Sequence, residues 1–146
     1  MLLVQGWCIL QADNPAGSSL DQIIHADQAL FDSFRRWAAE NESPFLDWRL
    51  VDYLNNHTGL LSFMASRNHR ASMVWDMLDW VATASARSFG VVYVFDDEDV
   101  PERTGYRRTE VDYSNVFRVH VVRDGQVTEQ SDPFLGPVHP HLFDAL

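Results

Sequence analysis

The chain has 146 residues, of which 46% are hydrophobic and 22% are charged. This length and composition are typical of one folded domain with its own core and exclude a wholly disordered chain. The formal net charge of −10 disfavours nucleic acid and anionic membranes as partners. It favours a basic partner, unless the acidity only keeps the protein soluble.

The first apolar run, residues 2–10, predicts a buried β-strand that contains the single cysteine, Cys8. A lone cysteine forms no internal disulfide, so we expect a reducing, cytoplasmic compartment. The run lacks the basic flank and the small-residue cleavage site of a signal peptide. No apolar run approaches the ~20 residues that span a bilayer, and we expect no membrane partner.

An amphipathic helix is predicted after the turn at residues 13–17. Ser18 or Ser19 is a suitable N-cap, and the helix is expected to end near Asn41. Asp27 interrupts the apolar stripe and is expected on the flank of the helix, because carboxylates are rarely buried. The stripe itself has helical spacing and comprises Leu20, Ile23, Ile24, Leu30, Phe31, Phe34, Trp37 and Ala38.

A hairpin and a second helix are predicted next. Residues 48–54 and 60–65 read as two strands on either side of a tight turn. Ser72 is a suitable N-cap for a helix that ends before Gly90. The inner stripe of this helix comprises Val74, Trp75, Leu78, Val81, Ala82 and Ser85.

The segment 91–95 is apolar on both faces and rich in β-branched residues, which predicts an interior strand. After a polar loop, residues 116–123 alternate, with Phe117, Val119 and Val121 on one face. Asp124 and Gly125 predict a two-residue type I′ turn into a returning strand over residues 126–129. The last segment, from residue 132, reads as coil.

The predicted order is β-α-β-β-α-β-β-β, and its first six elements match the ferredoxin-like pattern. We therefore predict an α+β fold with two helices on one face of a mixed, mostly antiparallel sheet. The C-terminal hairpin extends one edge of this sheet. No linker or repeat is present, so residues 1–146 are expected to form a single domain.

The most pointed local feature is the acidic run at the end of the strand over 91–95, which comprises Asp96, Asp97, Glu98 and Asp99. Carboxylates are the ligands of hard cations, but side chains that alternate along a strand bring at most two of them together. The run also suits contact with a basic partner, or it is a solvated loop. Of these three interpretations, partner contact is favoured over a metal site.

Other patterns for chemistry are weak. His139 and His141, with Asp144 beyond, lack the further ligands and spacing of a zinc site. Cys8 reads as a buried, inert thiol. The sequence has no nucleophile elbow, phosphate-binding loop, dinucleotide fingerprint or metalloprotease helix. We therefore expect a binding protein with neither a metal nor a cofactor.

Five tryptophans are present, and four of them fall on positions expected to face the core: Trp7, Trp37, Trp48 and Trp75. Trp80 lies off the inner stripe of the second helix, beside Met73 and Met77. A large apolar group on a surface is typical of an interface anchor. The alternative is that this helix is buried over a wider face.

The segment 88–99, Ser-Phe-Gly-Val-Val-Tyr-Val-Phe-Asp-Asp-Glu-Asp, resembles the central signature of the immunity protein 7 family. In that family an aromatic-glycine pair leads a hydrophobic strand into an acidic run. Segments 115–119, 123–127 and 132–137 also resemble the family, as does the pair Gly6 and Trp7. The resemblance extends over nearly the whole chain, and the C-terminal half carries most of it.

The resemblance implies an immunity protein, encoded beside a bacterial toxin, that binds the toxin domain and blocks its active site. The toxins associated with the family are nucleases and ADP-ribosyltransferases, whose basic clefts suit an acidic inhibitor. The expected toxin-binding residues are the run 96–99 and Trp80. The rival hypothesis is a small ferredoxin-like enzyme that acts on a small molecule through Asp97, Asp99 or His120.

Overall fold

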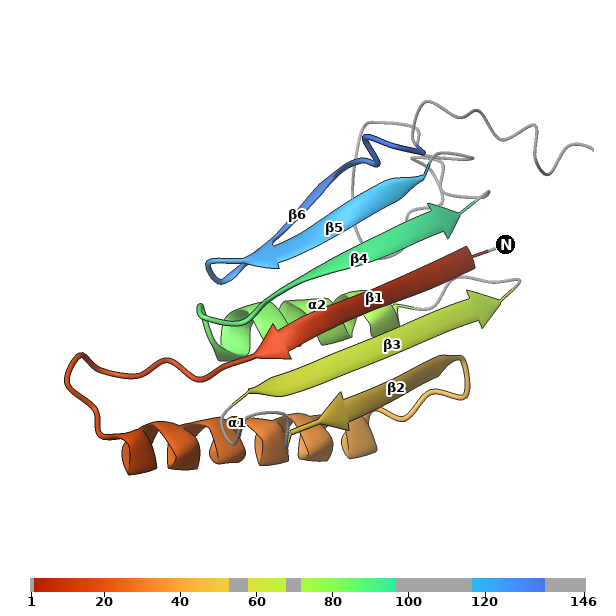
Figure 1. Ribbon diagram of the computed structural model, residues 1–146. Helices are drawn as coiled ribbons and strands as arrows, with labels where there is room; N and C mark the ends of the chain where they lie inside the picture. Colours follow the sequence, from red (N-terminus) through yellow and green to blue (C-terminus); the bar gives the residue numbers. More distant parts are fainter. Residues whose placement is uncertain (1, 53–57, 68–71, 97–116, 136–146) are drawn as a thin grey trace, which may run out of the picture.

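The computed structural model describes residues 2–52, 58–67, 72–96 and 117–135 (Figure 1). Within these ranges the elements follow the predicted order, although several strand ends differ from the expected ones. The elements are β1 (Leu2–Leu10), α1 (Leu20–Glu40), β2 (Leu46–Val51), β3 (Gly59–Arg67), α2 (Met73–Ala84), β4 (Phe89–Asp96), β5 (Arg118–Arg123) and β6 (Gln126–Ser131).

The strands form one sheet in the order β2-β3-β1-β4-β5-β6. Its first four strands have the ferredoxin-like arrangement, and the hairpin β5–β6 extends one edge, so the predicted α+β fold is confirmed. All the described pairings are antiparallel, where a mixed sheet was expected. The reason is that β3 separates the parallel strands β1 and β2, and β1 separates the parallel strands β3 and β4.

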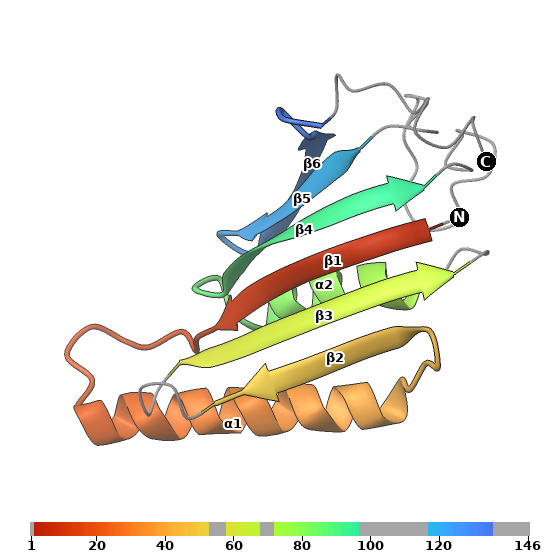
Figure 2. The same cartoon turned by 45° about the vertical axis from the view of Figure 1, so that its right-hand side comes forward.

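Both helices lie on the same face of the sheet, as predicted (Figures 1 and 2). Their buried side chains, such as Phe31 of α1 and Leu78 of α2, join the inward side chains of the strands in one core cluster. Alternate residues of each strand face this core, as the pleat of a sheet requires. On the three central strands the inward core residues are Val4, Cys8, Leu10, Leu61, Phe63, Ala65, Val92 and Val94.

The ends of α1 are as the sequence predicts. The Ser19 hydroxyl accepts a hydrogen bond from the Gln22 amide, and the Gln22 side chain accepts one from the Ser19 amide, which completes a capping box. Asn41 ends the helix. For α2, Ser72 occupies the N-cap position but its side chain makes no capping hydrogen bond.

The hairpin β5–β6 confirms the predicted turn. Arg123 pairs with Gln126, so the loop has two residues. Both of them have positive φ, 52° at Asp124 and 74° at Gly125, as a type I′ turn requires. The strand β4 lies between β1 and β5, which confirms that the segment 91–95 is interior.

Asp27 is fully buried, and its expected position on the flank of α1 is wrong. Its carboxylate accepts a hydrogen bond from the Ala12 amide at 2.6 Å and so ties the loop after β1 to α1. In the same loop the Asp13 carboxylate accepts hydrogen bonds from the Ser85 hydroxyl and the Ala86 amide. These bonds join the loop after β1 to the loop that enters β4.

The loop anchor gives a first prediction. Asp27→Ala leaves the buried Ala12 amide without an acceptor, so the free energy of unfolding is expected to fall by about 1–3 kcal/mol. Chemical denaturation measures this change. The matched control is Asp32→Ala on the same helix, where the side chain is 69% exposed and makes only a surface ion pair with Arg35. The control is expected to change stability by less than about 0.5 kcal/mol; equal losses would contradict the anchoring role.

Candidate functional site

The acidic run begins within the sheet. Asp96 is the last residue of β4, and its backbone lies opposite Leu2 at the start of β1. Asp97, Glu98 and Asp99 lie outside the described residues. The described part of the run, Asp96, therefore ends an interior strand, at the end of the sheet where β1 begins.

Trp80 lies between the two helices and is partly buried. Its ring centroid is 5.4 Å from that of Phe34 and 6.1 Å from that of Trp37, both on α1. The ring of Trp48, on β2, also packs edge-on against Phe34 at 5.2 Å. Trp80 thus contributes to helix packing, which agrees with a wide buried face on α2, and its contact with a partner stays a prediction.

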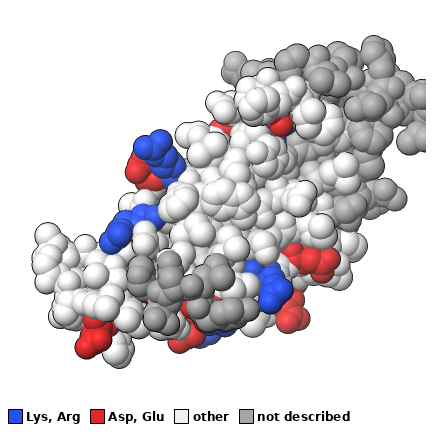
Figure 3. All heavy atoms as spheres, viewed as in Figure 1, with Lys and Arg blue, Asp and Glu red and all other residues white. Residues whose placement is uncertain are grey.

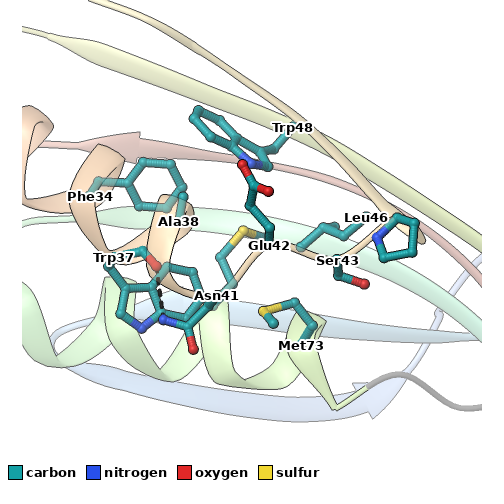
Figure 4. Close-up of a pocket in the computed structure, with 11 residues that line it drawn as sticks. Phe34, Trp37, Ala38, Asn41, Glu42, Ser43, Leu46, Trp48 and Met73 are labelled. Atoms are coloured by element: carbon teal, nitrogen blue, oxygen red, sulfur yellow. Dashed lines mark hydrogen bonds between the residues drawn. The ribbon is translucent and has the colours of Figure 1, made fainter.

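Beside these rings lies a pocket of about 450 Å³, between the C-terminal end of α1, the start of β2 and the start of α2 (Figure 4). Its walls include Trp37, Trp48 and Met73. The side chain of Glu42 extends toward Trp48 (Figure 4). Aromatic walls with one carboxylate suit an apolar or a cationic side chain.

His120, the histidine of the rival enzyme hypothesis, is fully buried beneath α2. Its Nε2 forms an ion pair with the Glu129 carboxylate, which also pairs with Arg118 at 3.2 Å. The ring of Trp75 packs against the imidazole, with the centroids 4.4 Å apart. Such a closed ionic cluster is typical of a structural role, because a substrate does not reach it.

Cys8 is fully buried, and burial raises the pKa of its thiol to about 12. Because the thiolate is the nucleophile, this side chain is poorly suited to nucleophilic catalysis. Within the described ranges no three His, Cys, Asp or Glu side chains gather where they could hold a metal ion. His139, His141 and Asp144 lie outside those ranges. No described helix is long and apolar enough to cross a membrane.

The face of the sheet opposite the helices carries large exposed side chains. Trp7 is 41% exposed, Tyr93 47% and Met64 54%. The prediction that Trp7 faces the core is wrong, because Val4, Cys8 and Leu10 take the inward positions of β1 and place residue 7 outward. The sequence of β1 is apolar at both odd and even positions. This pattern does not indicate whether the odd or the even side chains face the helices.

Strand register brings these side chains together. Gln5 of β1 lies opposite Met64 of β3 and Tyr93 of β4. Trp7 packs edge-on against Phe89, with the ring centroids 6.3 Å apart. We define the open face as the outward residues at the centre of β1, β3 and β4: Gln5, Trp7, Ile9, Leu60, Ser62, Met64, Phe89, Val91 and Tyr93.

Figure 3 shows the molecule from the side of the open face. The centre, over β1, β3 and β4, carries no charged side chain, and the charged groups lie around the margin. Arg49 and Asp47 of β2 border it on one side. The arrangement is therefore a surface with an apolar, aromatic centre and a charged rim.

The chain was compared with known protein families, curated proteins and solved structures. The family model described as "Immunity protein 7" matches residues 1–144, which is nearly the whole chain. No curated protein and no solved structure matches the chain.

The buried thiol gives a second prediction. With a pKa of about 12, roughly one thiol in ten thousand is ionised near pH 8. In the folded protein Cys8 is therefore expected to react with an aromatic disulfide reagent about a thousandfold more slowly than in concentrated guanidinium chloride, where about one thiol in ten is ionised. The absorbance of the released thiolate measures both rates. Fast reaction of the folded protein would show that Cys8 is accessible and ionised.

Proposed function

The chain belongs to the immunity protein 7 family, and we propose on that basis that it binds a cognate bacterial toxin domain and neutralises it by covering the active site. The observation that carries the proposal is the match of residues 1–144 to a family of immunity proteins against toxins. We further propose that the toxin is a nuclease or an ADP-ribosyltransferase, and that the protein meets it in the cytoplasm.

Charge supports this choice of partner. The protein carries a formal net charge of −10, and enzymes that act on nucleic acids or nucleotides bind them in basic clefts. Opposite charge speeds the encounter of two proteins and selects among partners. The run from Asp96 to Asp99 is our proposed contact with that cleft, because an interior strand holds its first residue in place.

The alternative, a small ferredoxin-like enzyme, depends on Asp97, Asp99 or His120. Of these three only His120 is described, and it is fully buried in an ion pair with Glu129. A general acid or base has to come within hydrogen-bond reach of its substrate. The burial of His120 therefore favours the binding protein over the enzyme.

Stoichiometry tests the proposed function. The protein and the toxin domain encoded by the adjoining gene are expected to form a one-to-one complex on a sizing column with light scattering. Titration of the toxin is expected to abolish its activity at one equivalent, because a bound inhibitor acts by occupancy. Chelator is expected to leave this end point unchanged. Loss of toxin activity at a small fraction of an equivalent would instead favour an enzyme.

The acidic run gives a mutational prediction. The double variant Asp97→Asn with Asp99→Asn is expected to weaken toxin binding roughly tenfold, mainly through slower association, and to reduce its dependence on salt. Surface plasmon resonance at several ionic strengths measures both effects. The control variant, Asp32→Asn with Glu40→Gln, removes two charges that are exposed on α1. If the control has the same effect, or if the melting temperature of the test variant collapses, the run is not the contact.

A further inference from the structure

We propose that the open face of the sheet is the surface on which the toxin docks, with Trp7, Met64 and Tyr93 at its centre. This inference rests on the proposed function and adds the place of contact and the chemistry of the partner. The partner surface would be apolar where it meets these three side chains.

The composition of the open face is unusual for a solvated sheet. An antiparallel sheet with one solvated face normally alternates apolar inward residues with polar outward ones. Here only Gln5 and Ser62 interrupt a group of outward side chains that is otherwise apolar or aromatic. Contiguous exposed apolar surface on a folded protein marks an interaction site, because its exposure to water is unfavourable until a partner covers it.

The backbone of the open face is held by strand pairing on both sides of β1. The strand β1 is paired along its length with β3 on one side and with β4 on the other. The ring of Trp7 is further held by its edge-on contact with Phe89. Aromatic side chains fixed on a paired sheet lose little freedom on binding, which is why tryptophan and tyrosine dominate the energetics of interfaces.

The net charge of the protein favours a toxin over a second copy of the chain as the partner on this face. A second copy of the chain also carries a formal charge of −10, so self-association brings two strongly acidic molecules together. A partner with a basic cleft is attracted instead. The acidic run begins at Asp96, at the end of β4, which also carries Tyr93 on the open face. An apolar centre on a protein of strong net negative charge suits a toxin with an apolar patch beside its basic cleft.

The test uses single substitutions in the full chain. Trp7→Ser and Tyr93→Ser are each expected to weaken binding to the toxin domain of the adjoining gene at least tenfold by titration calorimetry. The control is Leu20→Ser, an exposed apolar residue of α1 that is 61% accessible and lies away from the open face. Circular dichroism and thermal melting check that each variant is folded.

A second measurement uses the unaltered protein. Met64 is 54% exposed and is expected to form its sulfoxide readily with peroxide, as followed by mass spectrometry. Bound toxin is expected to slow the oxidation of Met64 severalfold. Met77, which is fully buried, serves as the internal reference for unfolding.

The outcomes separate this inference from the proposed function. If the unaltered protein binds the toxin but neither variant weakens it and Met64 stays reactive in the complex, the docking face is wrong and the proposed function stands. If the unaltered protein does not bind the toxin, both fail. A third outcome is that the protein alone forms a dimer, and that Trp7→Ser dissociates this dimer without changing toxin binding. In that case the open face binds a second copy of the chain and the inference is overturned.

Discussion

The right-handedness of crossover connections decides which face of this sheet is covered. The chain passes from β1 through α1 to β2 and from β3 through α2 to β4, and each passage skips one strand. The two passages cross the sheet in opposite directions and start from strands that point in opposite directions. Reversing both the direction of the crossover and the direction of its first strand leaves the covered face unchanged. Two right-handed crossovers therefore place both helices on the same face of the sheet (Figure 2). Neither of the two described helices covers the other face.

Near β5 the usual distribution of charged and apolar side chains between the two faces of the sheet is partly inverted. The side chains of Arg118 and His120 point inward, beneath α2, where Glu129 offsets their burial. Ionic groups are thus enclosed on the covered side, while Trp7 and Tyr93 stay exposed on the uncovered side. A protein that only needed a stable core would place these residues the other way round, since buried ion pairs add little stability and exposed aromatics add none.

Local patterns in the sequence predicted the elements well. Interactions within a few residues of one another determine the N-cap of α1 at Ser19, one of the two predicted candidates, the end of α1 at Asn41 and the type I′ turn at Asp124. The interior place of β4 follows from its apolar residues on both faces. The acidic run follows this strand directly in the sequence, and its described residue, Asp96, is the last residue of β4.

Local sequence patterns did not predict which side chains of each strand face the helices. The strand β1 is apolar at both odd and even positions, so Trp7 was assigned to the core, yet it faces outward. The contacts that determine the orientation of β1 are distant in sequence. A Cβ atom at Gly6 would come within 2.9 Å of Val92 and Phe63, so the inward side of β1 has room only for glycine at this even position. In β5 the alternation singled out Val119 and Val121, while the partner at Glu129 and the ring of Trp75 place Arg118 and His120 inward.

The sequence by itself determined the elements, their order and the family, because these depend on short-range patterns and motifs. The tertiary structure alone decided which side chains of each strand meet the helices and which remain exposed, because that choice depends on contacts between residues far apart in the chain.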